Sequence, residues 1–137
     1  MSNHLSDPLF VLTSYCCSAY DEKYLLEAVY GILNQTDQRF QVILVDDCSP
    51  LSTTPELLRT INNLDPRIHV HQKTKRAGVS SSRNYGINLA SEFGSPFVLF
   101  NDGDDISHEQ RLKKTREYFE DNEVDMVYST YIPIEES

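Results

Sequence analysis

Residues 40–45 form a run that is apolar except for Gln41, and this run constrains the fold more than any other stretch of the chain. A nearly continuous apolar strand is typical of a parallel sheet whose two faces are both covered by helices. Residues 97–100 form a second run of this kind, too short for a helix and bounded by turn-forming residues. The two runs therefore predict buried strands inside a layered α/β protein.

Helical patterns separate the expected strands along the whole chain. Strands are predicted at residues 9–17, 40–45, 68–71, 97–101 and 125–132. Between them, helices are predicted from Asp21 as N-cap, from Thr54 as N-cap, over residues 78–90, and over residues 108–120 with Ser107 and Gln110 as a capping box. This alternation predicts βαβ units and a mainly parallel sheet with helices on both faces.

Composition limits the class of protein and of partner. The 137 residues suit a single domain, and the formal net charge of −9 argues against nucleic acid and anionic membranes as primary partners. No apolar stretch is long enough for a transmembrane segment, and the N-terminus lacks a signal pattern. The three cysteines do not form a disulfide framework, so buried thiols in a reducing, cytoplasmic compartment are expected.

Three aspartates follow the strand predicted at residues 97–101 within four positions: Asp102, Asp104 and Asp105. If the backbone stays extended, Asp102 and Asp104 point to the same side, because side chains alternate along a strand. Like charges this close repel each other, and a divalent cation with oxygen ligands relieves that repulsion. We expect a metal site at Asp102 and Asp104; the alternative is a solvated acidic turn.

Polar clusters also follow the other strands, at residues 18–21, 46–49 and 73–83. The carboxyl ends of parallel strands lie along one edge of a sheet, so these clusters should meet the acidic turn in one crevice. Lys73, Lys75 and Arg76 lie in the third cluster, and we interpret them as a solvated loop.

The residues of these clusters allow two interpretations each. Asp46 and Asp47 either accept hydrogen bonds from a base or ribose, or one of them caps the following turn. The small residues from Gly78 to residue 82 either present amides to a diphosphate or allow close helix–sheet packing. Arg83 either contacts a nucleotide or forms a salt bridge with Asp46 or Asp47.

The same motifs, in order and spacing over residues 10–115, resemble an inverting family 2 glycosyltransferase of the GT-A fold. The resemblance rests on residues 18–25, 32–36, 45–49, 78–90 and 102–105, the last of which is similar to the Asp-x-Asp signature. It implies a Rossmann-like nucleotide-binding domain and a nucleotide-sugar donor, most often a UDP-sugar. The acceptor would be a glycan or a lipid-linked molecule in polysaccharide biosynthesis.

The resemblance also implies roles for individual residues. Ala19 and Tyr20 lie in the opening motif on the nucleotide side, and Asp46 or Asp47 would contact the base. Gly78 and Arg83 would face the nucleotide. Asp102 would approach the ribose or the metal, and Asp104 would hold Mn²⁺ or Mg²⁺ against the diphosphate. The metal would act as a Lewis acid toward the departing diphosphate.

No catalytic base is assigned, because in this family it lies downstream of the Asp-x-Asp segment. We therefore expect residues 1–137 to be a single donor-binding domain that stops before the acceptor half. A non-catalytic nucleotide-sugar-binding or scaffold domain is the main alternative, and a phospho-receiver domain is a second. Peripheral membrane association and homo-oligomerisation are left open.

Overall fold

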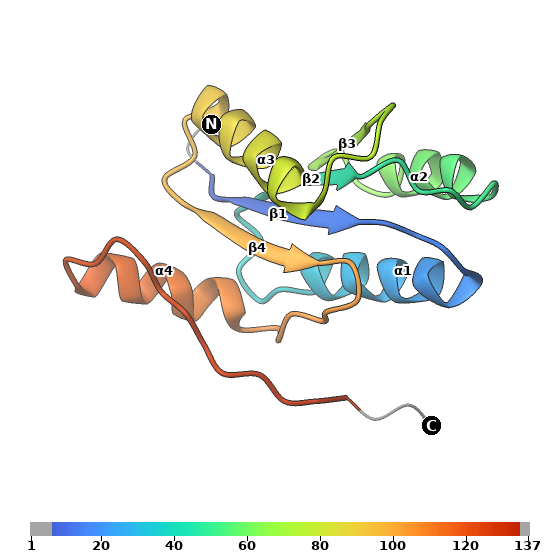
Figure 1. Cartoon of the computed structure of the whole chain (residues 1–137). Coiled ribbons are helices and arrows are strands. Elements are labelled where there is room, and N and C mark those ends of the chain that lie inside the picture. The colour runs from blue at the N-terminus through green and yellow to red at the C-terminus, as the bar shows by residue number, and fades with distance from the viewer. Residues whose placement is uncertain (1–6, 135–137) are drawn as a thin grey trace.

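The computed structural model describes residues 7–134. Within these residues, β1 (Leu9–Ser14), β2 (Gln41–Asp46), β3 (Ile68–Gln72) and β4 (Val98–Asp102) form a sheet in the order β3–β2–β1–β4, and every pairing is parallel. The helices are α1 (Ala19–Leu33), α2 (Thr54–Asn62), α3 (Val79–Phe93) and α4 (Arg111–Asp121). A helix follows each strand, so the predicted α/β fold with a parallel sheet is confirmed (Figure 1).

Helices cover both faces of the sheet, and successive side chains of a strand point alternately into the two resulting cores. Leu9 and Val11 of β1 pack with Ala90 of α3 on one face. Phe10 and Leu12 point to the other face, where the core also contains side chains of α1, α2 and α4. Figure 1 shows α3 on one side of β1 and β4, with α1 and α4 on the other. Two covered faces explain why β1 and β2 are buried along their whole length.

Helix α1 begins three residues earlier than the sequence predicts. Its N-cap is Ser18, whose hydroxyl accepts a hydrogen bond from the backbone N–H of Asp21. The Asp21 carboxylate in turn accepts from the backbone N–H of Cys17. The prediction of Asp21 as N-cap is therefore wrong. Ser18 is the N-cap, and Asp21 makes the second hydrogen bond of a reciprocal capping pair.

Two other predicted caps are also displaced. Thr53, not Thr54, is the N-cap of α2, and Pro55 lies in the first turn. Helix α4 begins at Arg111 without a side-chain cap. The predicted capping box of Ser107 and Gln110 does not form, because the Ser107 hydroxyl donates to the side chain of Asn101 instead.

The fifth strand, predicted over residues 125–132, is absent from the structure as described to residue 134. This segment has no regular secondary structure, and Figure 1 shows it leaving α4 without joining the sheet. Its large side chains are exposed, including Tyr128 at 91% and Ile132 at 88%. Alternating apolar residues favour a strand only where a partner strand is available, and the sheet formed by the described residues pairs with no part of this segment.

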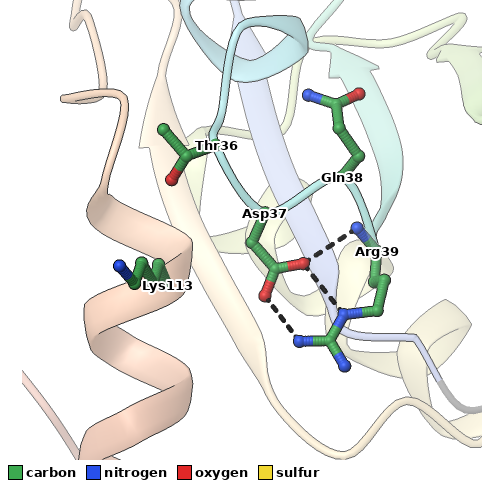
Figure 2. A pocket seen from close by; sticks show the side chains of 5 residues that line it. All are labelled: Thr36, Asp37, Gln38, Arg39 and Lys113. Atoms are coloured by element: carbon green, nitrogen blue, oxygen red, sulfur yellow. Dashed lines mark hydrogen bonds and ion pairs between the residues drawn. The ribbon is translucent and has the colours of Figure 1, made fainter.

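The turn between α1 and β2 is attached to α4 by charged side chains. Asp37 accepts hydrogen bonds from the backbone N–H and guanidinium of Arg39, and its other partner is Arg116 of α4 at 2.7 Å. Figure 2 shows the Asp37 carboxylate directed at Arg39 in a shallow depression that both residues line together with Lys113 of α4. Burial alone would raise the pKa of Asp37, but the two arginines lower it to about 2. Asp37 therefore stays ionised and holds α4 against the turn.

Candidate nucleotide-binding edge

The last two residues of β1 lie between the two acidic corners of the sheet edge. Ser14 is paired in register with Asp46 of β2, and Thr13 with Asp102 of β4. The Ser14 hydroxyl donates to the Asp46 carboxylate at 2.7 Å, and the Thr13 hydroxyl donates to Asp102 at 3.3 Å. The predicted meeting of the Asp46 and Asp102 clusters at one edge is thus confirmed, and β1 bridges them.

Asp46 is fully buried at the end of β2. Besides the Ser14 hydroxyl, its carboxylate accepts hydrogen bonds from the backbone N–H and the hydroxyl of Ser49. A buried carboxylate requires several donors, and these residues supply them. The two bonds from Ser49 also close the turn after β2. Asp46 therefore caps its turn, which was the alternative to contact with a base.

Asp47 connects the end of β2 to the start of α3. Its carboxylate accepts from the backbone N–H groups of Ala77 and Gly78, each at 2.9 Å, and from Lys73 at 3.3 Å. Burial favours the neutral acid, but these three donors outweigh it and lower the pKa of Asp47. The carboxylate is thus ionised, and it orders the loop that leads into α3.

This contact bears on two earlier interpretations. The amide of Gly78 was one of those that could face a diphosphate, and in the protein alone it donates to Asp47. Lys73 was predicted to be solvated, but its side chain is 12% exposed and bonds Asp47 and the Ser81 hydroxyl. The positive φ of 94° at Gly78 suits a residue without Cβ and lets both amides face the same carboxylate.

Arg83 of α3 pairs with the second acidic corner. Its Nη2 lies 3.0 Å from Oδ1 of Asp102, and both side chains are partly exposed, at 38% and 44%. The alternative considered for Arg83, a salt bridge to Asp46 or Asp47, does not form, and the carboxylate of Asp47 is instead bonded by Lys73 and backbone donors. Arg83 Nε is buried without a hydrogen-bond partner among the described residues.

The chain turns immediately after Asp102, so the extended backbone on which the same-side placement of Asp102 and Asp104 depended does not continue to Asp104. The N–H of Asp105 donates to the carbonyl of Asp102 at 3.0 Å, which closes a tight turn. A Cβ at Gly103 would lie 2.8 Å from the carbonyl oxygen of Thr13, so only glycine allows the turn to lie this close to β1. Asp104 is exposed at the tip, and its carboxylate has no hydrogen-bond partner among residues 7–134.

Asp105 completes the acidic turn, which we define as residues 102–105. Its partial burial raises its pKa, and the nearby carboxylates of Asp104 and Asp102 raise it further. Repulsion inside the turn is therefore present in the protein alone, and a cation bound beside Asp104 would relieve it.

Ala19 and Tyr20 lie in the first turn of α1, which follows the same sheet edge. Tyr20 is 71% exposed, so its ring is available to a ligand. Ala19 lines a shallow groove between α1 and α2 together with Glu22 and Leu57. Sequence reasoning missed Thr13 and Ser14, whose signal was a polar side chain at the end of an apolar strand.

The acidic turn carries few carboxylates for a cation, so any ion there would need further ligands from a bound molecule. No group of three or more His, Cys, Asp or Glu side chains is placed to hold a metal within residues 7–134. Mg²⁺ in phosphate-binding sites is held by one or two carboxylates plus the phosphates of the substrate. Asp104 is exposed without a hydrogen-bond partner among the described residues, and Asp102 lies two residues before it, so the residues present would fit a cation of this kind. No helix in the described part of the chain is long and apolar enough to cross a membrane.

Comparison with known proteins decides the family. Residues 11–137 match the family described as Glycosyl transferase family 2. The chain belongs to this family. Its sheet is similar to that of S. aureus TarS, residues 1–349, in complex with UDP-GlcNAc, with a TM-score of 0.69 and 25% identity over 84% of this chain and 31% of that one. The Rossmann-like GT-A fold predicted from the motifs is confirmed.

Two curated relatives agree with this assignment. An uncharacterized glycosyltransferase of Methanocaldococcus jannaschii is 31% identical over 129 residues, which are 92% of this chain and 43% of that protein. The minor teichoic acid biosynthesis protein GgaB of Bacillus subtilis is 34% identical over 110 residues, 77% of this chain and 12% of that protein. The family 2 chain described here thus spans less than half the length of these relatives.

Proposed function

We propose that this family 2 chain is the donor-binding domain of a glycosyltransferase that uses a UDP-sugar. The observation that carries the proposal is the exposed Asp104, two residues after Asp102 at the carboxyl end of β4. This turn lies inside the residues that match the glycosyltransferase family. The UDP-GlcNAc complex of the similar TarS structure supports a uridine nucleotide as donor. The name of GgaB supports a cell-surface polysaccharide or lipid-linked acceptor.

In this proposal Asp102 and Asp104 hold Mn²⁺ or Mg²⁺ together with the donor's diphosphate. The bound ion supplies Lewis-acid stabilisation of the charge that develops on the leaving diphosphate. Arg83, which already contacts Asp102, orients that carboxylate and adds a positive charge near the nucleotide. The guanidinium is partly exposed, so it can contact a ligand without leaving its ion pair.

The remaining residues shape the nucleotide pocket. Asp47 fixes the start of α3 through Ala77 and Gly78, and this places the positive end of the helix toward the edge. Tyr20 offers an exposed ring for contact with the nucleotide. Asp46 acts on the base only through the turn that it closes, because its own carboxylate is buried. No residue of the chain is proposed as the catalytic base.

Charge gives this proposal a clear experimental signature. The protein carries a formal charge of −9, and the acidic turn adds local negative potential where the diphosphate would bind. Uridine diphosphate should therefore bind poorly without a divalent ion and much more tightly with one. Calorimetric titration of uridine diphosphate, with and without Mn²⁺, measures this difference directly.

The expected result is binding that requires Mn²⁺ in the parent and is abolished in Asp104→Ala, a variant that keeps the fold. Equal binding by Asp104→Ala would show that the metal assignment is wrong. Binding to the parent without any transfer or hydrolysis of a UDP-sugar would favour a non-catalytic nucleotide-sugar-binding domain. A chain that does not bind the nucleotide but accepts a phosphoryl group from a phosphoryl donor would favour the phospho-receiver alternative.

A further inference from the structure

A buried carboxamide lies directly beneath the acidic turn. Asn101, the residue before Asp102 on β4, is only 4% exposed. Its Nδ2 donates to the carbonyl oxygens of Asp102 and Asp105, at 2.9 and 3.0 Å. One side-chain amide thus joins the first and last residues of the turn, which fixes its backbone from inside the protein.

The other end of the Asn101 side chain is held by two donors. Its Oδ1 accepts from the hydroxyl of Ser107, and Nη1 of Arg111 lies 3.5 Å away. Arg111 also donates to the Ser107 hydroxyl at 3.0 Å and to the carbonyl of Phe100 at 2.9 Å. Three side chains therefore form one connected network, and its members have few alternative positions.

This network is anchored to a distant part of the chain. Gln35, which is 2% exposed, donates to the carbonyl of His108 at 2.7 Å and accepts from the N–H of Leu112 at 2.9 Å. The N–H of Thr36 donates to the carbonyl of Glu109 at 2.8 Å. The segment that carries Ser107 and Arg111 is thus fixed to the end of α1, and it cannot move freely with the acidic turn.

Such rigidity has a use at this position. Residues 102–105 carry three carboxylates, whose mutual repulsion favours opening of the turn. Two hydrogen bonds from a fixed side chain oppose that opening through the backbone and leave the carboxylates available. Outer partners that orient ligand side chains in this way are commonly required for full metal affinity.

We infer that Asn101 is a positioning residue that holds the acidic turn in the conformation that binds the metal and the donor diphosphate. It acts together with Ser107 and Arg111, and it touches neither the metal nor the nucleotide. The inference rests on the proposed function, and it adds a determinant of that site which lies outside the Asp-x-Asp segment.

The test uses the 137-residue chain with Asn101→Leu, which has a similar volume but no amide. We expect a loss of roughly 10- to 100-fold in affinity for uridine diphosphate in the presence of Mn²⁺. The weak binding without Mn²⁺ should be unchanged. Asn122→Leu is the matched control, because that side chain is exposed and donates only to the Tyr118 carbonyl at the end of α4.

Amide hydrogen exchange provides a second measurement that needs no ligand. Exchange at the Asp105 amide, which donates to the Asp102 carbonyl, should become at least about tenfold faster in Asn101→Leu. Exchange at the Asp47 amide, which donates to the Ser14 carbonyl, should not change. If Asn101→Leu does not fold, Ser107→Ala removes a supporting hydroxyl and should give the same pattern with smaller amplitude.

The outcomes separate this inference from the proposed function. Parent-like affinity of Asn101→Leu, together with loss of binding in Asp104→Ala, would overturn the positioning role alone. An equal loss of affinity with and without Mn²⁺ would also overturn it, because a general structural role predicts that result. A parent chain that does not bind uridine diphosphate at all would overturn both.

Discussion

The two acidic corners of the sheet edge lie on either side of β1, but their environments are opposite. At the end of β2, Asp46 is fully buried and Asp47 is 6% exposed, and both carboxylates are surrounded by donors of the protein itself. At the end of β4, Asp102 is 44% exposed and Asp104 lies at the tip of a turn. The first corner orders loops, whereas the second can still accept a ligand.

The comparison shows that an acidic residue at a strand end is not by itself a binding group. What distinguishes the corners is whether the carboxylate already has its hydrogen bonds, because a satisfied buried acid gains little from a ligand. The variants below test this division through the free energy of unfolding, from the largest expected effect to the smallest.

Asp46→Ala should have the largest effect. It leaves the hydroxyl of Ser14 and the N–H and hydroxyl of Ser49 without their acceptor in a buried site. We expect the free energy of unfolding, measured in urea, to fall by about 3 kcal/mol. A loss below about 1 kcal/mol would show that the β2 corner is not the structural one.

Gly103→Ala should follow, because its new Cβ would lie 2.8 Å from the carbonyl oxygen of Thr13. The acidic turn must shift away from β1, and we expect a loss of about 2 kcal/mol in the free energy of unfolding. Faster hydrogen exchange at the Asp105 amide should accompany it. Unchanged stability together with unchanged exchange would mean that the turn does not depend on this close approach.

The sequence predicted the order of elements well, because each depends on local patterns. Apolar runs, interrupted in β2 only by Gln41, predicted β2 and β4, and four-residue periodicity predicted the buried face of α1. The strand predicted at residues 125–132 failed because strand formation requires a partner that local pattern does not supply. Cap positions differed by one to three residues, since neighbouring polar residues compete for the same amides.

The site was predicted less completely, for a related reason. The position of polar clusters at strand ends was enough to predict that Asp46 and Asp102 lie at one edge of the sheet. It did not reveal which donor each acid takes, because the pairing of Asp47 with the start of α3, and of Arg83 with Asp102, depends on tertiary geometry. Asn101 gave no signal, since an Asn beside an acidic motif is unremarkable until its two carbonyl partners are known.

Arg116→Met tests a third carboxylate, Asp37, which lies at the opposite edge and resembles the β2 corner. Asp37 keeps Arg39 but loses the 2.7 Å contact to α4, so its pKa should rise from about 2 toward its ordinary value. A lowered pKa stabilises the fold above the unfolded pKa, and that stability is lost as pH falls from about 4 to 2. We expect a loss of about 1 kcal/mol at pH 7 that shrinks as the pH falls toward 2, where only the loss of the hydrogen bond from Arg116 to the Arg39 carbonyl remains.

Lys113→Met is the control for this experiment. Lys113 is also on α4 and lines the same depression, but it is exposed and makes no ion pair with the described residues (Figure 2). Urea unfolding at several pH values should leave the control within about 0.5 kcal/mol of the parent. A constant difference between Arg116→Met and the parent at every pH would exclude ionised Asp37 as the cause.

Asp104→Ala should have the smallest effect on stability, within about 0.5 kcal/mol of the parent, because its carboxylate bonds nothing among the described residues. It should nevertheless abolish metal-dependent binding of uridine diphosphate. A large loss of stability would place Asp104 with the structural acids and remove the distinction between the two corners.

Paramagnetic broadening by Mn²⁺ tests the central claim most directly. In NMR spectra of the chain with uridine diphosphate, substoichiometric Mn²⁺ should first broaden the amide signals of residues 102–105. The broadening should disappear in Asp104→Ala. Broadening confined to other acidic segments, such as residues 117–125, or unchanged in Asp104→Ala, would contradict the assignment of the acidic turn as the place where metal and nucleotide bind.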